Sequence, residues 1–92
     1  MDRYLVEVPH EAGELACALV VRTFLDTGSH YLTRADWGCQ DGVHKAWMIV
    51  AASDREEARS IVPPPLRTAA QVVRLNKFDS AEIDEIVRRH SE

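Results

Sequence analysis

The sequence lacks the features that mark several protein classes. Its longest apolar run, residues 15–21, has seven residues, whereas a membrane-spanning helix needs about 20. The chain carries a net charge of −4 and has no clustered basic segment of the kind that phosphate binding requires. Its opening residues, MDRYLVEV, do not have the layout of a signal peptide. These absences argue against nucleic acid and membranes as partners.

Cysteine is also scarce, and its scarcity indicates a compartment. The sequence contains only Cys17 and Cys39, whereas small secreted domains usually depend on a larger disulfide framework. Two cysteines suit a reducing compartment better, so we expect a cytoplasmic protein. The 92 residues are enough for one hydrophobic core and too few for two. We therefore expect a single domain over residues 1–92.

Local patterns in the first half predict a strand, a helix and a hairpin. Apolar and polar residues alternate over residues 3–9, which is typical of a strand that ends at Pro9. Residues 11–26 have the apolar face of a helix, with Cys17 interpreted as a core residue and Gly28 as the left-handed stop. Asp41-Gly42 separates two β-rich runs, residues 30–39 and 44–52, and predicts a two-residue hairpin turn.

The second half adds a helix, a strand and a final helix. Residues 53–56 form a capping box that starts a helix, and the three prolines at 63–65 end it. Residues 71–76 alternate as a strand, and Asp79 opens a final helix with an apolar stripe at Ile83, Ile86 and Val87. The order β-α-β-β-α-β-α predicts an α+β fold. We expect a ferredoxin-like βαββαβ sandwich, with antiparallel sheet order 4-1-3-2 and an added C-terminal helix.

The hairpin register predicts an open sheet face that needs a cover. The face away from the helices would mix apolar residues with charges, and exposed apolar patches of this kind usually mark interfaces. A second copy of the chain, forming a homodimer through this face, is the first expectation, and the C-terminal helix is the second. Two interpretations of this face stay open. Either it is only an interface, or some of its residues line a ligand site between subunits. The apolar residues of the predicted face are Leu5, Leu32, Ile49 and Val72, and its ligand-site candidates are Glu7, Arg34, Asp36, Trp47 and Arg74.

A second candidate site lies at one end of the predicted sheet. The end of the first strand and the tip of the hairpin meet there, which brings His10, Cys39 and His44 together. Two imidazoles and a thiolate are suitable ligands for zinc, nickel or copper. Asp36, Glu11 or a water molecule would supply the missing ligand.

Two other interpretations of these three residues stay open. Cys39 could act as a nucleophile with His44 as its base, although no oxyanion site is recognisable. Alternatively, all three are structural: His10 caps the first helix, His44 packs on the hairpin and Cys39 is a small buried hydrophobe.

Three segments of the chain resemble a small, uncharacterised bacterial protein family of about this length. They are RYLVEVPHE (residues 3–11), TGSHYLTRADWGCQDGVHKAW (residues 27–47) and LNKF (residues 75–78). More loosely, the YLVE opening and the ferredoxin-like order are similar to the dimeric α+β-barrel superfamily, which includes muconolactone isomerase-like and nickel-binding members. The resemblance implies no catalytic residue in this chain.

These observations favour binding over catalysis. We expect a homodimer that binds a divalent transition metal, zinc or nickel, or a small ligand. The alternatives are a small-molecule enzyme, isomerase-like or Cys-dependent, and a structural protein–protein interaction module. An enzyme would need a water-shielded pocket that contains a group with a perturbed pKa.

Overall fold

The computed structural model describes residues 1–27 and 29–91 and has an α+β fold. Among these residues no helix is both long and apolar enough to span a membrane. The stop predicted at Gly28 lies outside the described residues. In chain order the helices and strands are β1 (Asp2–Pro9), α1 (Glu14–Thr27), α2 (His30–Thr33), β2 (Asp36–Trp37), β3 (Lys45–Ala52), α3 (Arg55–Ser60), β4 (Gln71–Leu75) and α4 (Ser80–His90), with 3-10 turns η1 (Cys39–Asp41) and η2 (Pro64–Leu66).

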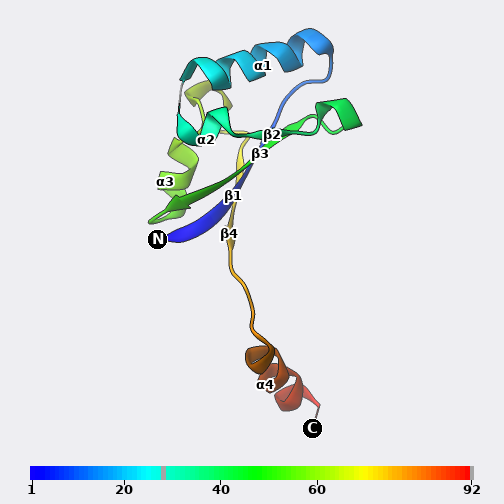
Figure 1. The fold of residues 1–92 in the computed structure, drawn as a ribbon, viewed down its shortest axis with the longest axis vertical. Coiled ribbons are helices and arrows are strands. Elements are labelled where there is room, and N and C mark those ends of the chain that lie inside the picture. The colour runs from blue at the N-terminus through cyan, green and yellow to red at the C-terminus, as the bar shows by residue number, and fades with distance from the viewer. Residues whose placement is uncertain (28, 92) are drawn as a thin grey trace.

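The four strands form one antiparallel sheet (Figure 1). Its order is β2-β3-β1-β4, which reads 4-1-3-2 when counted from the β4 edge. The central strand β1 pairs with β3 along its whole length, from Asp2–Ala52 to Pro9–Lys45. The far end of this ladder, where β1 ends and β3 begins, carries the candidate site.

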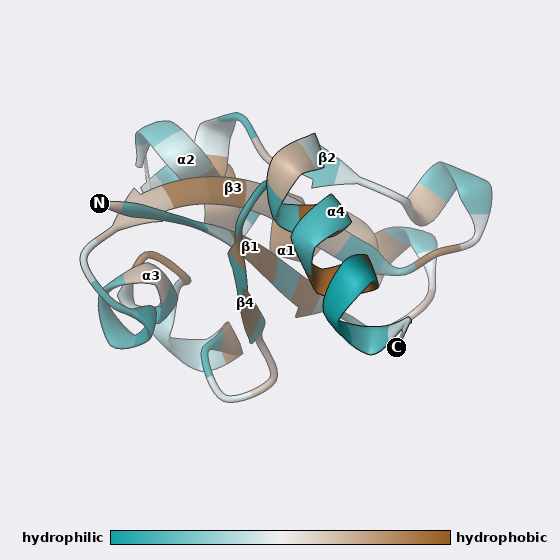
Figure 2. Ribbon diagram, turned by 90° about the horizontal axis from the view of Figure 1, so that it is seen from below, coloured by the Kyte–Doolittle hydropathy of each residue, from teal (hydrophilic) through white to brown (hydrophobic). Residues whose placement is uncertain are grey.

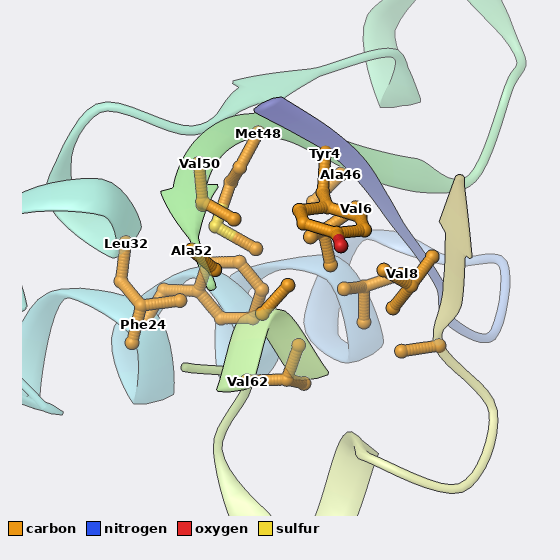
Figure 3. Packing of buried hydrophobic residues seen from close by; sticks show 13 residues of the cluster. Tyr4, Val6, Val8, Phe24, Leu32, Ala46, Met48, Val50, Ala52 and Val62 are labelled. Carbon is orange, nitrogen blue, oxygen red and sulfur yellow. The ribbon is translucent and has the colours of Figure 1, made fainter. Parts of the chain in front are cut away.

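The core lies on one face of the sheet because residues of alternate parity point to the same side of a strand. Val6 and Val8 of β1 and Val50 of β3 are fully buried on this face. Phe24 of α1 and Leu32 of α2 complete the cluster from the helical side, and Figure 3 shows these side chains gathered together. Each such side chain contributes about 1.5–3 kcal/mol when it leaves water.

Helix α1 covers the sheet only in part. Phe24 is its single buried side chain among the described residues, whereas Leu15 and Leu19 are 72% and 44% exposed. The Phe24 ring lies against Trp37, with ring centroids 4.9 Å apart. The helix begins at Glu14, later than the Glu11 start that the sequence predicts. This helix is therefore anchored mainly through Phe24, while its first turn approaches the hairpin loop.

The capping box of α3 is displaced by one residue from the prediction. The Asp54 carboxylate, and not the Ser53 hydroxyl, caps the helix by accepting from the Glu57 amide at 2.8 Å. Glu57 reaches back and accepts from the Ser53 amide at 3.2 Å and from its hydroxyl. The principle of reciprocal capping holds, with Asp54 and Glu57 as the pair.

The predicted strand over residues 30–39 is mostly wrong. Residues His30–Thr33 form one helical turn, which buries Leu32 in the core at 1% exposure instead of placing it on the open face. Only Asp36 and Trp37 pair with β3, opposite Trp47 and Ala46, as the predicted register requires.

The hairpin loop is longer than the predicted two residues. It runs through η1 to Gly42, whose positive φ of 81° favours glycine, and closes where the Gly38 amide donates to the Lys45 carbonyl at 3.1 Å. Gly38 has no room for a side chain, because a Cβ would lie 2.7 Å from the Val43 carbonyl oxygen.

The open sheet face exists, but β4 contributes different residues from those predicted. Val72 pairs with Val6 and is buried on the core face, and Arg74 pairs with Tyr4 of the same face. Val73 takes the open-face position beside Leu5, which also pairs with Ile49 on its other side. The open face therefore has an apolar row of Leu5, Ile49 and Val73, and the last two are about half exposed at 55% and 50%.

Helix α4 does not cover this face, so the second expectation is wrong. The helix stands away from the sheet beyond β4, and all of its residues are exposed (Figure 1). The radius of gyration is 16.8 Å, compared with about 12 Å for a compact domain of this length. In Figure 2, apolar positions interrupt the hydrophilic ribbon of α4. Its apolar stripe at Ile83, Ile86 and Val87 is in water.

Candidate metal centre

Backbone pairing beyond the end of the sheet brings two histidines together. The His10 amide donates to the His44 carbonyl at 3.0 Å, which continues the β1–β3 ladder one step past Pro9 and Lys45. The two imidazole centroids are 5.8 Å apart in an edge-to-face arrangement. A short irregular extension of two strands therefore positions both side chains.

Cys39 joins these histidines from η1. Ligand atoms of His10, Cys39 and His44 all lie within 4.8 Å of one another. His10 Nε2 and Cys39 Sγ are 3.1 Å apart, close enough for a hydrogen bond between thiol and imidazole. The structure thus brings together the three residues that the sequence placed at this end.

The tautomer of the His10 imidazole suits metal binding. Its Nδ1 lies 2.9 Å from the Glu11 carbonyl oxygen, which can only accept, so Nδ1 carries the proton. In the neutral imidazole, the lone pair is then on Nε2, the nitrogen that faces Cys39. Metal-ligating histidines commonly have this arrangement, with one nitrogen fixed by a carbonyl and the other free to coordinate.

His44 carries a polar atom that lacks a partner. Among the described residues, its Nδ1 is the one buried side-chain nitrogen or oxygen that makes no hydrogen bond. An unsatisfied buried polar atom typically costs about 1–3 kcal/mol. A metal ion bound at this nitrogen would give it the partner that it lacks.

Cys17 is the residue that sequence reasoning missed. Its Sγ donates to Cys39 Sγ at 2.8 Å, from the first turns of α1, so it is not a simple core residue. It is half-buried, as is Cys39. Neither Asp36 nor Glu11 contributes a side-chain atom to the donor group in the described part of the chain. Cys17 also lies outside the group whose ligand atoms are all within 4.8 Å of one another, and it contacts that group through the sulfur of Cys39.

The environment of Cys39 argues against a catalytic nucleophile. Loss of hydration raises the pKa of Cys39, the adjacent Cys17 raises it further, and a backbone hydrogen bond lowers it only in part. A nucleophilic cysteine needs the opposite, a depressed pKa. His10, and not His44, is the imidazole bonded to this thiol.

Two sulfurs in contact would repel each other as thiolates, and a bound cation would remove that repulsion.

A pocket gives access to the site from solvent. It has a volume of about 380 Å³ and is lined by Gly13, Glu14, Cys17, Ala18, Cys39, Gln40 and His44. Both sulfurs and one imidazole therefore form part of its surface. A metal ion or a small reagent can reach the donors without unfolding of the chain.

The other predicted ligand residues do not converge on one site. Glu7 accepts from Trp47 Nε1 at 2.9 Å and lies 3.5 Å from Lys45 Nζ, so its carboxylate is already paired. Arg34, Asp36 and Trp47 do share a pocket of about 260 Å³ on the open face, together with Leu5 and Ile49. Arg74 instead lies 3.8 Å from Asp2 in an exposed ion pair.

Comparison with known proteins adds no assignment to this site. No protein-family model, curated protein or solved structure matches the chain. The resemblance to a small bacterial family and to dimeric α+β-barrel proteins therefore stays a sequence-based expectation.

Proposed function

We propose that the chain binds a zinc ion through His10, Cys39 and His44, and that Cys17, whose sulfur contacts Cys39, moves in as the fourth ligand. The observation that carries this proposal is the cluster itself: three ligand atoms within 4.8 Å of one another, and a second sulfur 2.8 Å from the first. Supporting features are the proton held on His10 Nδ1 and the partnerless Nδ1 of His44. The first leaves the lone pair of a neutral His10 on Nε2, and the second is a buried imidazole nitrogen that a metal ion would satisfy.

The donor set favours zinc over the other candidate metals. Two thiolates and two imidazoles are the ligands of many tetrahedral zinc sites. Sulfur ligands argue against calcium and magnesium, which prefer oxygen. Nickel remains the alternative, and a planar arrangement of the same four donors would favour it.

The ratio of Zn²⁺ to protein and the coordination geometry of the bound metal test this site. Untagged, reduced protein is expected to bind one Zn²⁺ per chain in equilibrium dialysis, with a dissociation constant below micromolar. Cobalt in the same site should show the intense visible bands of tetrahedral Co²⁺ and a near-ultraviolet thiolate charge-transfer band. Failure to bind at micromolar metal would remove the proposal, and a planar nickel spectrum with tighter binding would change the metal.

We also propose that the fold is the ferredoxin-like βαββαβ arrangement in a cytoplasmic homodimer. Support for the fold comes from the antiparallel strand order and from the crossings through α1 and α3. Support for the dimer comes from the exposed row of Leu5, Ile49 and Val73, which a second sheet would cover. Such a contact would also close the pocket of Arg34, Asp36 and Trp47 against a partner and make it a small-ligand cavity.

The dimer is tested by mass in solution. Light scattering should give twice the 10.4 kDa of one chain. Ile49→Asp is expected to give a folded monomer, because it places a charge within the apolar row of the proposed contact. Val43→Asp is the control, because Val43 is 41% exposed in the hairpin loop, outside the apolar row. A monomeric natural protein, or an Ile49→Asp variant that still dimerises, would contradict this interface.

A further inference from the structure

The distance between the sulfurs of Cys17 and Cys39 is longer than in a disulfide and shorter than between two thiolates on one zinc ion. The two sulfurs are 2.8 Å apart. A disulfide bond is about 2.05 Å long. Two thiolates on one tetrahedral zinc, each about 2.3 Å from the metal, are about 3.8 Å apart. A movement of less than about 1 Å therefore closes a disulfide, and a movement of about 1 Å in the opposite direction makes room for a metal.

We propose that Cys17 and Cys39 form a redox-sensitive thiol pair, in which reversible oxidation to a disulfide expels the metal ion. The release of metal rests on the proposed zinc site, whereas formation of the disulfide does not. These are the only cysteines of the sequence, so no other disulfide within one chain competes with this one.

The pair is open to small oxidants from two sides. Both sulfurs line the pocket of about 380 Å³ that also contains His44. Both also line a second pocket of about 420 Å³, together with Val21 and Trp37. A cysteine buried in a core is inert, whereas an accessible cysteine beside a second, resolving cysteine can be oxidised reversibly; the raised pKa of Cys39 makes its oxidation slower than that of a low-pKa thiol.

The chemistry balances with hydrogen peroxide as the oxidant. One sulfur, as its thiolate, attacks a peroxide oxygen, which breaks the O–O bond and gives a sulfenic acid and hydroxide. The second thiolate attacks the sulfenic sulfur, forms the S–S bond and releases a second hydroxide, and the two protons lost by the thiols convert both hydroxides into water. Two thiols lose two protons and two electrons, and the peroxide takes up both. A dithiol reductant reverses the step by thiol–disulfide exchange.

Loss of the thiolates explains why the metal would leave. The thiolate, and not the disulfide sulfur, is the metal ligand. After oxidation, only His10 and His44 remain of the four proposed donors, and two neutral imidazoles hold zinc weakly. Reduction restores all four donors at positions that the strands and α1 still define.

Metal-free protein tests the disulfide separately from zinc. With one equivalent of hydrogen peroxide at low protein concentration, the natural chain should lose about 2 Da and both free thiols. Cys17→Ser and Cys39→Ser should instead give sulfenic or higher oxides, or disulfide-linked dimers. His44→Ala is the matched control, because it keeps both thiols and should still close the disulfide within the chain. Oxidation of the natural chain mainly to sulfinic acid or to linked dimers would overturn the proposal.

Zinc-loaded protein tests whether formation of the disulfide releases the metal. Peroxide should release one zinc per disulfide formed, detected with a chromogenic chelator, and a dithiol should restore binding. If the disulfide forms but the reduced protein never binds zinc, the metal site fails while the thiol pair stands. If zinc binds but is retained after the disulfide has formed, the switch is wrong while the metal site stands.

Discussion

Replacing Cys39 by serine is expected to lower the affinity for Zn²⁺ by more than about 100-fold. Cys39 is the central donor of the group, in contact with His10 Nε2 at 3.1 Å and with Cys17 Sγ at 2.8 Å. A serine hydroxyl is similar in shape but remains protonated at neutral pH, so it replaces a thiolate ligand poorly. Competition against a chromophoric chelator at fixed pH measures the change.

Proton release gives a second measurement of the same variant. Because its surroundings raise the pKa of Cys39, the metal-free thiol is protonated at neutral pH, and zinc must displace that proton. The natural protein should therefore release more protons per zinc than Cys39→Ser does, as buffers of different ionisation enthalpy reveal in calorimetry. Its zinc affinity should rise with pH until the thiols are ionised.

A neighbouring residue serves as the control for this prediction. Gln40 follows Cys39 in η1 and lines the same pocket, but it offers no strong zinc donor. Gln40→Ser should leave the affinity within about 3-fold of the natural value, as surface substitutions generally do. Equal affinities of the natural protein and Cys39→Ser would count against the zinc site.

Features with local causes are the ones that the sequence predicts. The alternation in β1 and the Asp79 cap of α4 depend on residues close in the chain, and both occur as expected, with Asp79 accepting from the Glu82 amide at 2.8 Å. Residues 30–33 differ because burial decides their conformation. Leu32 reaches the core through a helical turn, and this outweighs the β preference of its neighbours.

The face of β4 illustrates a different limit. Val72 and Val73 are adjacent and both apolar, so alternation cannot tell which one points to the core. Pairing of Val72 with Val6 decides it, and that contact joins residues far apart in the chain.

The sequence predicts the part of the candidate site that the strands position, but not the part that α1 positions. His10 and His44 follow from the β1–β3 ladder, which alternation reveals. Cys17 does not, because a helical pattern says which side of α1 is apolar but not which loop its first turns approach. The only signal in the sequence was that Cys17 is one of two cysteines and follows His10 by seven positions. Placement of the helix by tertiary packing makes it a candidate ligand.

That placement depends on Phe24, and Phe24→Ala is expected to destabilise the protein by about 3–5 kcal/mol. Phe24 is fully buried and packs against Trp37 at a centroid distance of 4.9 Å. Trp37 in turn lies 5.8 Å from the His10 ring, so the same contact connects α1 to the site. A domain of this length has a total stability of roughly 5–14 kcal/mol, and the loss is therefore a large part of it.

Chemical denaturation of reduced, metal-free protein measures this loss as a lower midpoint with an unchanged slope. Leu25→Ala is the control on the same helix, because Leu25 is 54% exposed and its truncation should change stability by less than about 1 kcal/mol. Zinc at 100 times its dissociation constant should return about 2.7 kcal/mol to Phe24→Ala, since the metal binds only the folded chain. If Phe24→Ala and Leu25→Ala destabilise equally, Phe24 does not anchor α1. If zinc stabilises the Phe24→Ala variant only when Cys17 is present, the helix and the metal site are coupled as this packing requires.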